Sequence, residues 1–143
     1  MRGLKSLRMY QNYITGQIPT EFGALAKLTT LAIDENFLTG PIPVELSLVP
    51  NLKNCELFLN QLTGPIPSQL SKLQLLEFLD IHQNLLVSTL PTELGQLSSL
   101  QYFDARSNQL TGPVRKCACL CSKMILLICL CSSSHTILPD CSF

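Results

Sequence analysis

Five asparagines recur at a constant spacing of 24 residues, and this period constrains the fold more than any other feature of the sequence. They are Asn12, Asn36, Asn60, Asn84 and Asn108. Apolar residues stand at fixed distances from each asparagine, eight, five and three residues before it and two after it. Because no insertion interrupts these columns over residues 4–110, chance does not account for them. The sequence therefore predicts a repeat architecture.

Each unit carries the same local signals in the same order. Apolar and polar residues alternate up to the asparagine, which is typical of a short strand with one buried face. A Thr-Gly pair follows, as at Thr39-Gly40, and predicts a turn because glycine accepts a positive φ without steric cost. A proline then discourages helix. The hydroxyl residue and acid or amide after it, as in Thr20-Glu21, predict the side-chain cap of a brief helical turn.

A unit of this length cannot bury its apolar positions alone, so the units must stack. Stacking brings the strands of successive units side by side, about 4.8 Å apart, and aligns the leucines in a continuous core. The predicted fold class is an α/β solenoid of 24-residue repeats, with a parallel β-sheet on one face and short 3-10 or helical turns and loops on the other. We expect the five asparagines to form a structural ladder that hydrogen-bonds backbone groups at the turn after each strand.

The unit L-x-x-L-x-x-L-x-L-x-x-N-x-L-T-G-x-I-P-x-E-L-G resembles the plant-type leucine-rich repeat, over about residues 4–115. This family includes the ectodomains of receptor-like kinases and receptor-like proteins. The resemblance implies a right-handed superhelix whose parallel strands line a concave face. We expect a solenoid over residues 1–115, with four full repeats and a partial fifth, and a separate tail over residues 116–143. The fourth unit has Val87-Ser88 in place of Thr-Gly, so we expect its turn to be strained or differently shaped.

The tail departs from the repeat and holds six of the seven cysteines. Residues 119–131 have the spacing CxC-x7-CxC, which is a weak zinc signal because zinc sites more often use CxxC. The apolar run at residues 124–131 is too short to span a bilayer. A divergent cap, membrane-proximal palmitoylation, and an aberrant gene end such as retained intron sequence stay open for this segment.

Composition and motifs exclude several classes of function. Charged residues make up 14% of the chain and the net charge is zero, which argues against a nucleic-acid partner. The sequence has no glycine-rich phosphate loop, no nucleophile elbow and no HExxH motif, and its two histidines, His82 and His135, stand in unrelated contexts. We therefore expect no enzyme activity, no cofactor, no metal and no small-molecule substrate.

The exposed face of the predicted sheet offers the best candidate for a binding surface. Glu56, Asp80 and Asp104 share one column on successive strands, where like charges repel. Aromatic residues flank this column and can anchor a basic protein or peptide segment. The predicted contact residues are Glu56, Phe58, Phe78, Asp80, His82, Tyr102, Asp104 and Arg106. Two alternatives stay open: solvated carboxylates that only keep the sheet from aggregating, and a metal site.

Three interpretations of function follow. The resemblance implies a segment of a receptor ectodomain that binds a peptide ligand or a co-receptor, in a parent protein at the plasma membrane. A stand-alone intracellular scaffold is the second, since the chain has no N-x-S/T sequon and its first ten residues lack the apolar core of an export signal. A truncated remnant without function is the third.

Overall fold

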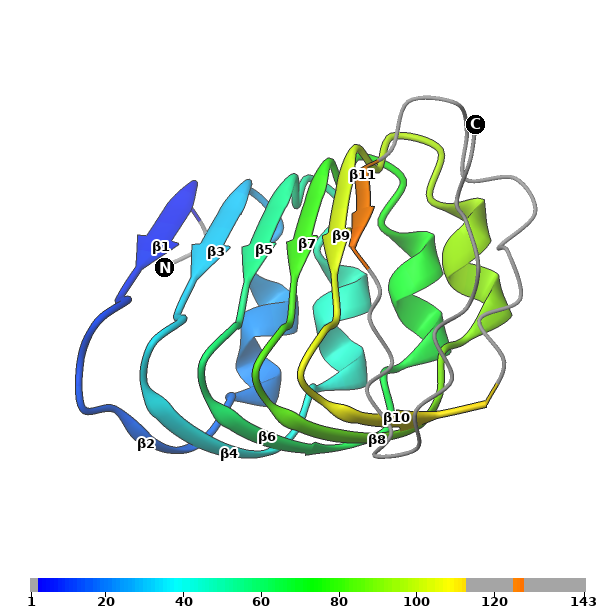
Figure 1. Cartoon of the computed structure of the whole chain (residues 1–143). Coiled ribbons are helices and arrows are strands. Elements are labelled where there is room, and N and C mark those ends of the chain that lie inside the picture. The colour runs from blue at the N-terminus through cyan, green and yellow to red at the C-terminus, as the bar shows by residue number, and fades with distance from the viewer. Residues whose placement is uncertain (1–2, 113–124, 128–143) are drawn as a thin grey trace.

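The computed structural model describes residues 3–112 and 125–127. Its first sheet has the order β1-β3-β5-β7-β9-β11, and every neighbouring pair is parallel. The strands are β1 (Ser6–Arg8), β3 (Thr30–Ala32), β5 (Asn54–Glu56), β7 (Phe78–Asp80), β9 (Tyr102–Asp104) and β11 (Ile125–Leu127). From β1 to β9 each residue pairs with the residue 24 positions later, as Leu7 does with Leu31. One repeat is therefore one coil of a solenoid (Figure 1), and the predicted fold class is confirmed.

A second parallel sheet follows the asparagines, and the sequence did not predict it. Its strands are β2 (Thr15–Gln17), β4 (Phe37–Pro41), β6 (Gln61–Gly64), β8 (Leu85–Thr89) and β10 (Gln109–Thr111), in the order β10-β8-β6-β4-β2. The Thr-Gly pairs, predicted to be turns, lie within these strands or at their ends. Because the coils stack in register, the backbone groups of this segment find partners in the next coil and not within a local turn.

Each repeat has one residue with a positive φ within its second strand or, in the fifth repeat, directly after it. Four of the five residues at this position are glycines, with φ between 74° and 90°, and the fifth is Ser88, with φ 76°. An L-residue in this region costs about 1–2 kcal/mol. The predicted strain at Ser88 is therefore present. Of the two expected alternatives, strain or a different shape, the first applies, because β8 still pairs with both β6 and β10.

Short 3-10 turns lie on the opposite side of the coil from the first sheet (Figure 1). They are η1 (Thr20–Ala24), η2 (Val44–Leu48), η3 (Ser68–Lys72) and η4 (Thr92–Gln96). The predicted side-chain cap is wrong: a proline precedes each turn, and no side chain caps it. In η1 the carbonyl of Pro19 accepts the first hydrogen bond, and the Thr20 hydroxyl contacts Glu21. The turns also pack closely, since a Cβ added at Gly23 would lie 2.5 Å from a backbone oxygen of η2.

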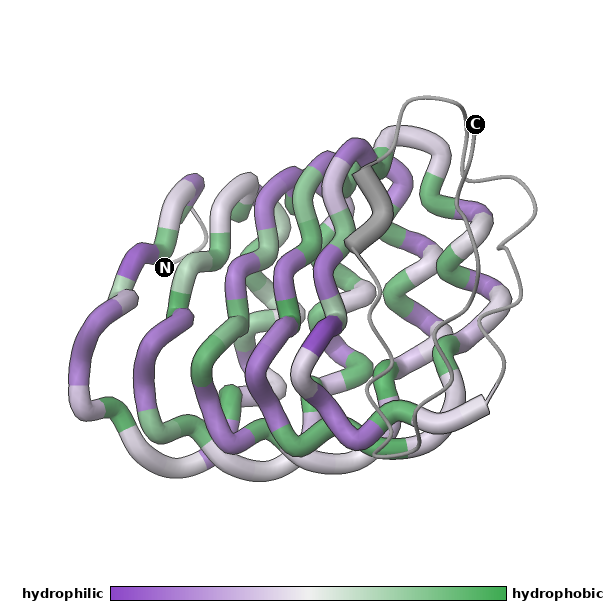
Figure 2. The backbone as a smooth tube through the Cα atoms, in the orientation of Figure 1, coloured by the Kyte–Doolittle hydropathy of each residue, from purple (hydrophilic) through white to green (hydrophobic). Residues whose placement is uncertain are grey.

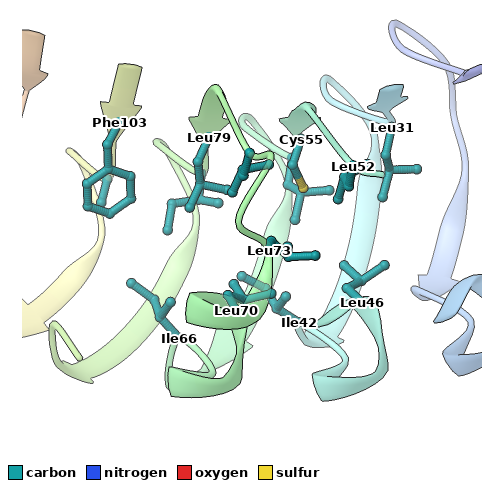
Figure 3. Close-up of a cluster of buried hydrophobic side chains, with 14 of the residues drawn as sticks. Leu31, Ile42, Leu46, Leu52, Cys55, Ile66, Leu70, Leu73, Leu79 and Phe103 are labelled. Atoms are coloured by element: carbon teal, nitrogen blue, oxygen red, sulfur yellow. The ribbon is translucent and has the colours of Figure 1, made fainter. Parts of the chain in front are cut away.

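The core lies between the first sheet and the 3-10 turns, as the buried side chains in Figure 3 show. Apolar residues recur at the same place in successive coils (Figure 2), and Leu28, Leu52 and Leu76 in one such column have no exposed surface. Cys55 replaces a leucine in this core and is a free thiol. Burial raises the pKa of Cys55 to about 12, so it packs as a small apolar group and not as a nucleophile.

Candidate functional site

The outward-facing columns of the first sheet form the concave face, and the structure brings all the predicted contact residues together there. Glu56, Phe58, Phe78, His82, Tyr102 and Arg106 are half-buried on β5, β7 and β9 or just after them. Asp80 and Asp104 are different, with only 5% and 0% of their surface exposed. The expectation that these two carboxylates are exposed and solvated is wrong. The sequence places them on the outward face of the sheet, but it does not show that neighbouring side chains fold over them.

Two aromatic stacks run along the concave face, one on each side of the acidic column. The rings of Phe78 and Tyr102 lie 4.3 Å apart, centroid to centroid, with their planes 3° from parallel. On the other side, Phe58 stacks on the His82 imidazole at 4.8 Å and 9°. Both stacks follow from the 24-residue register, because residues one repeat apart occupy adjacent strands. They give the face rigid, partly exposed rings.

Asp104 is neutralised within the chain by Arg106. The guanidinium donates from Nε to both carboxylate oxygens at 3.0 Å and from Nη2 to Oδ2 at 2.7 Å, and the Arg106 backbone N–H donates to Oδ1 at 2.9 Å. Burial alone would raise the pKa of Asp104, but these bonds and the Arg106 charge outweigh it and hold the pKa below its ordinary value. Burial and the nearby carboxylates, in turn, raise the pKa of Tyr102.

Asp80 has a similar partner in His82. Its Oδ1 accepts from the His82 backbone N–H at 3.2 Å and lies 2.6 Å from His82 Nδ1. His82 Nδ1 also lies 4.0 Å from Asp104 Oδ2, so these three residues have ligand-type atoms within 4.8 Å of one another. Hydrogen bonds among them and to Arg106 account for this spacing. The arrangement is a chain of alternating acids and bases in which each carboxylate already has a donor.

Asp34 has no such partner, and sequence reasoning left it out of the predicted site. It is 4% exposed, and its Oδ1 accepts no hydrogen bond within the described part of the chain. Burial raises its pKa, and the charges of Glu35 and Asp80 add to this effect against a backbone hydrogen bond. Burial, Asp34 and Asp80 likewise raise the pKa of Glu56, which Arg8 partly offsets. The signal was available, because Asp34 stands one repeat before Phe58 in the same column.

The asparagines lie at the junction between the two sheets and bind backbone groups of two coils. Asn60 is typical: its Oδ1 accepts from the Leu38 N–H at 2.9 Å, and its Nδ2 donates to the carbonyls of Ile33, Leu57 and Phe58. The same pattern recurs at Asn36, Asn84 and Asn108. Asn12 is exposed and donates to two carbonyls of its own coil. These amides hold the coils together and have little capacity left for a ligand.

The predicted cysteine cluster and apolar run of the tail lie outside the described residues, apart from the backbone of β11. That strand pairs in parallel with β9 and extends the first sheet by one strand. Within the described residues, no helix has the length and apolar character needed to cross a membrane.

Comparison with known proteins supports the same architecture. The family model for the Leucine Rich Repeat matches residues 3–25. The ectodomain of the Arabidopsis thaliana receptor kinase GASSHO1/SCHENGEN3 superposes with a TM-score of 0.78 and 34% identity, over 79% of this chain. The Arabidopsis receptor kinase HAESA superposes with a TM-score of 0.74 and 37% identity, over 76% of this chain. The chain is a leucine-rich repeat protein.

This leucine-rich repeat chain spans 14% of the matched GASSHO1/SCHENGEN3 chain and 18% of the HAESA chain. It spans 59% of a chain in the BIR3–SERK2 complex of Arabidopsis thaliana, at 30% identity and a TM-score of 0.74. The GASSHO1/SCHENGEN3 structure contains CASPARIAN STRIP INTEGRITY FACTOR 2, and the HAESA structure contains the peptide hormone IDA and the co-receptor SERK1. A search of curated proteins finds no match. The fold is thus that of receptor ectodomains, which are typically non-catalytic.

Proposed function

We propose that this chain is a non-catalytic recognition module, a segment of a leucine-rich repeat receptor ectodomain that binds a protein or peptide ligand on its concave face. The observation that carries the proposal is the pair of aromatic stacks on that face, Phe78 on Tyr102 and Phe58 on His82. Relatives with this fold were solved with a peptide hormone and with a co-receptor, which supports the same class of partner here.

Stacked rings suit this role for an energetic reason. Aromatic side chains bring large contact area with few rotatable bonds, so little conformational entropy is lost when a partner orders them. Here each ring is already held by its neighbour, at 4.3 Å in one stack and 4.8 Å in the other. Hot spots of binding are enriched in such anchors. We therefore assign the main contacts to Phe58, Phe78 and Tyr102, with Glu56, His82 and Arg106 around them.

Asp80 and Asp104 act from beneath this surface. Because each is buried and already bonded to His82 or Arg106, neither offers a free carboxylate to a partner. They fix the orientation of His82 and Arg106 through hydrogen bonds. In this arrangement the two carboxylates hold the surrounding side chains in place, and the partner contacts the aromatic rings.

Selection of a random peptide library on the purified chain tests the proposal. Calorimetry would compare enriched peptides on the unmodified chain and on the Phe78→Ala variant. Leu48→Ala is the matched control, because Leu48 is a 62% exposed apolar residue on η2, on the other side of the coil. We expect Phe78→Ala to weaken binding at least about tenfold and Leu48→Ala to leave it unchanged. Enriched peptides that bind Phe78→Ala as tightly as the unmodified chain would overturn the proposal.

A further inference from the structure

The concave face divides into two parts that differ in how their carboxylates are neutralised. In the C-terminal part, Asp104 is bound by the Arg106 guanidinium and Asp80 by the His82 imidazole. In the N-terminal part, Asp34 and Glu56 form no ion pair with any residue over 3–112. The charge of Arg8 lowers the pKa of Glu56 without forming an ion pair with it. Within the described residues, Asp34 and Glu56 therefore lack the direct ion pairs that Asp80 and Asp104 have.

Asp34 is the unusual member of this group. It is 96% buried, since 4% of its surface is exposed, yet Oδ1 has no hydrogen-bond partner among the described residues. A buried polar atom without a partner costs about 1–3 kcal/mol, and more when it is charged. Such a group in a native protein marks stored strain, a catalytic role, or a water or ion that completes its hydrogen bonds. Asp104, on the same face, has its hydrogen bonds completed by the Arg106 guanidinium, which binds both carboxylate oxygens.

The neighbours of Asp34 fit the same ligand. Backbone hydrogen bonds from Gln11 N to Asp34 O and from Glu35 N to Phe58 O place Tyr10, Asp34 and Phe58 in one column on adjacent coils. One face of the Phe58 ring is stacked on His82 in the following coil. Its other face is therefore turned toward the preceding coil, where Asp34 stands. Tyr10, 48% exposed, flanks Asp34 from the N-terminal side.

We propose that Asp34 and Glu56, flanked by the rings of Tyr10 and Phe58, form a receptor site for one guanidinium group, the side chain of an arginine in the partner. A planar guanidinium can donate two hydrogen bonds to a carboxylate and at the same time stack on an aromatic face, which an ammonium cannot do. This inference rests on the proposed function, since it names the cation site of the same concave face. It also relocates that site, because the acids expected from the sequence, Asp80 and Asp104, are already paired.

The test uses the full chain and two small probes, N-acetyl-arginine amide and its neutral isostere N-acetyl-citrulline amide, followed by backbone amide chemical shifts. We expect saturable shifts around Asp34, Glu56 and Phe58 with the arginine probe and none with the citrulline probe. Asp34→Asn should weaken arginine binding at least about tenfold. Glu93→Gln removes the same charge from an exposed position on η4 and should change nothing.

Several results would overturn the inference: equal shifts with both probes, shifts confined to the surroundings of Asp104, or unchanged affinity in Asp34→Asn. The amide spectrum of each variant reports whether it is folded, and Glu56→Gln serves as a second variant with the same expected loss. Failure here is separable from failure of the proposed function. Enriched peptides that depend on Phe78 but not on Asp34 would refute the guanidinium site and leave peptide recognition standing. Arginine binding at Asp34, with no enriched peptide that depends on Phe78, would support the guanidinium site and refute the proposed peptide recognition.

Discussion

Replacing Ser88 with glycine should stabilise the protein, although it shortens a side chain and adds flexibility. Ser88 has φ 76°, and every equivalent residue in the other repeats is a glycine with φ between 74° and 90°. The backbone of β8 is kept in this conformation by pairing with β6 and β10. Stacking of the coils therefore imposes a conformation that serine disfavours.

The size of the effect follows from two opposing terms. Glycine removes a strain of about 1–2 kcal/mol, and its larger backbone freedom in the unfolded chain costs about 0.5–1 kcal/mol. The net gain in the free energy of unfolding is about 0.5–1 kcal/mol. For a chain of 143 residues, a gain of 1 kcal/mol raises the melting temperature by about 2–4 °C.

Urea unfolding followed by circular dichroism measures this change, with two controls on the same strand. Val87→Gly introduces the same residue one position earlier, where φ is ordinary, and should lower the free energy of unfolding by about 1 kcal/mol. Ser88→Ala keeps a Cβ at the strained position and should change stability by less than about 0.5 kcal/mol. A loss of stability in Ser88→Gly comparable with that in Val87→Gly would refute the reasoning.

Four further predictions use the same unfolding assay. Asn60→Leu removes four hydrogen bonds, three of them buried, and should cost about 2–4 kcal/mol, whereas Asn12→Leu, at an exposed position, should cost under about 1 kcal/mol; equal losses would contradict the ladder. The lowered pKa of Asp104 stabilises the folded protein at pH values above the unfolded pKa, and this stabilisation is lost as the pH falls through the folded pKa. Asp104→Asn should therefore lower the free energy of unfolding most at neutral pH. The pKa of Asp34 is raised, so its carboxylate destabilises the folded protein increasingly as the pH rises through the folded pKa. The free energy of unfolding of Asp34→Asn, relative to that of the unmodified protein, should therefore increase with pH, and a difference independent of pH would refute this. Gly23→Ala should destabilise by about 1–3 kcal/mol through the clash with η2, and no loss would show that the turns can separate freely.

The sequence was sufficient for the parts of the fold that depend on period and polarity. Columns of asparagine and leucine repeat with the coil, so strand positions, parallel order and register could be read from one spacing. The second sheet could not, because Thr-Gly is a turn signal when a unit is considered alone. Only stacking supplies the neighbouring strand that makes the same residues part of a sheet. The sequence likewise identified the proline before each 3-10 turn only as a helix breaker. In the structure the carbonyl of each of these prolines accepts the first backbone hydrogen bond of the turn that follows.

The candidate site shows the same limit at the level of side chains. The sequence placed Phe58, Phe78, His82 and Tyr102 on one face, and the stacks follow from register. Burial of the carboxylates depends on which neighbouring side chains cover them, and the position of a residue in the repeat does not show this. The sequence therefore favoured Asp80 and Asp104 because three acids stood in one line. The structure instead points to Asp34, because only the three-dimensional arrangement shows that its Oδ1 accepts no hydrogen bond from the described residues.

The most direct test of the central claim is to map where a library-selected peptide binds, from the backbone amide shifts of the full chain. If the concave face is the recognition surface, shifts will concentrate on β5, β7 and β9 and on the residues that follow them. The amides of η1, η2, η3 and η4 will remain unchanged. Shifts confined to those 3-10 turns or to the second sheet would contradict the account.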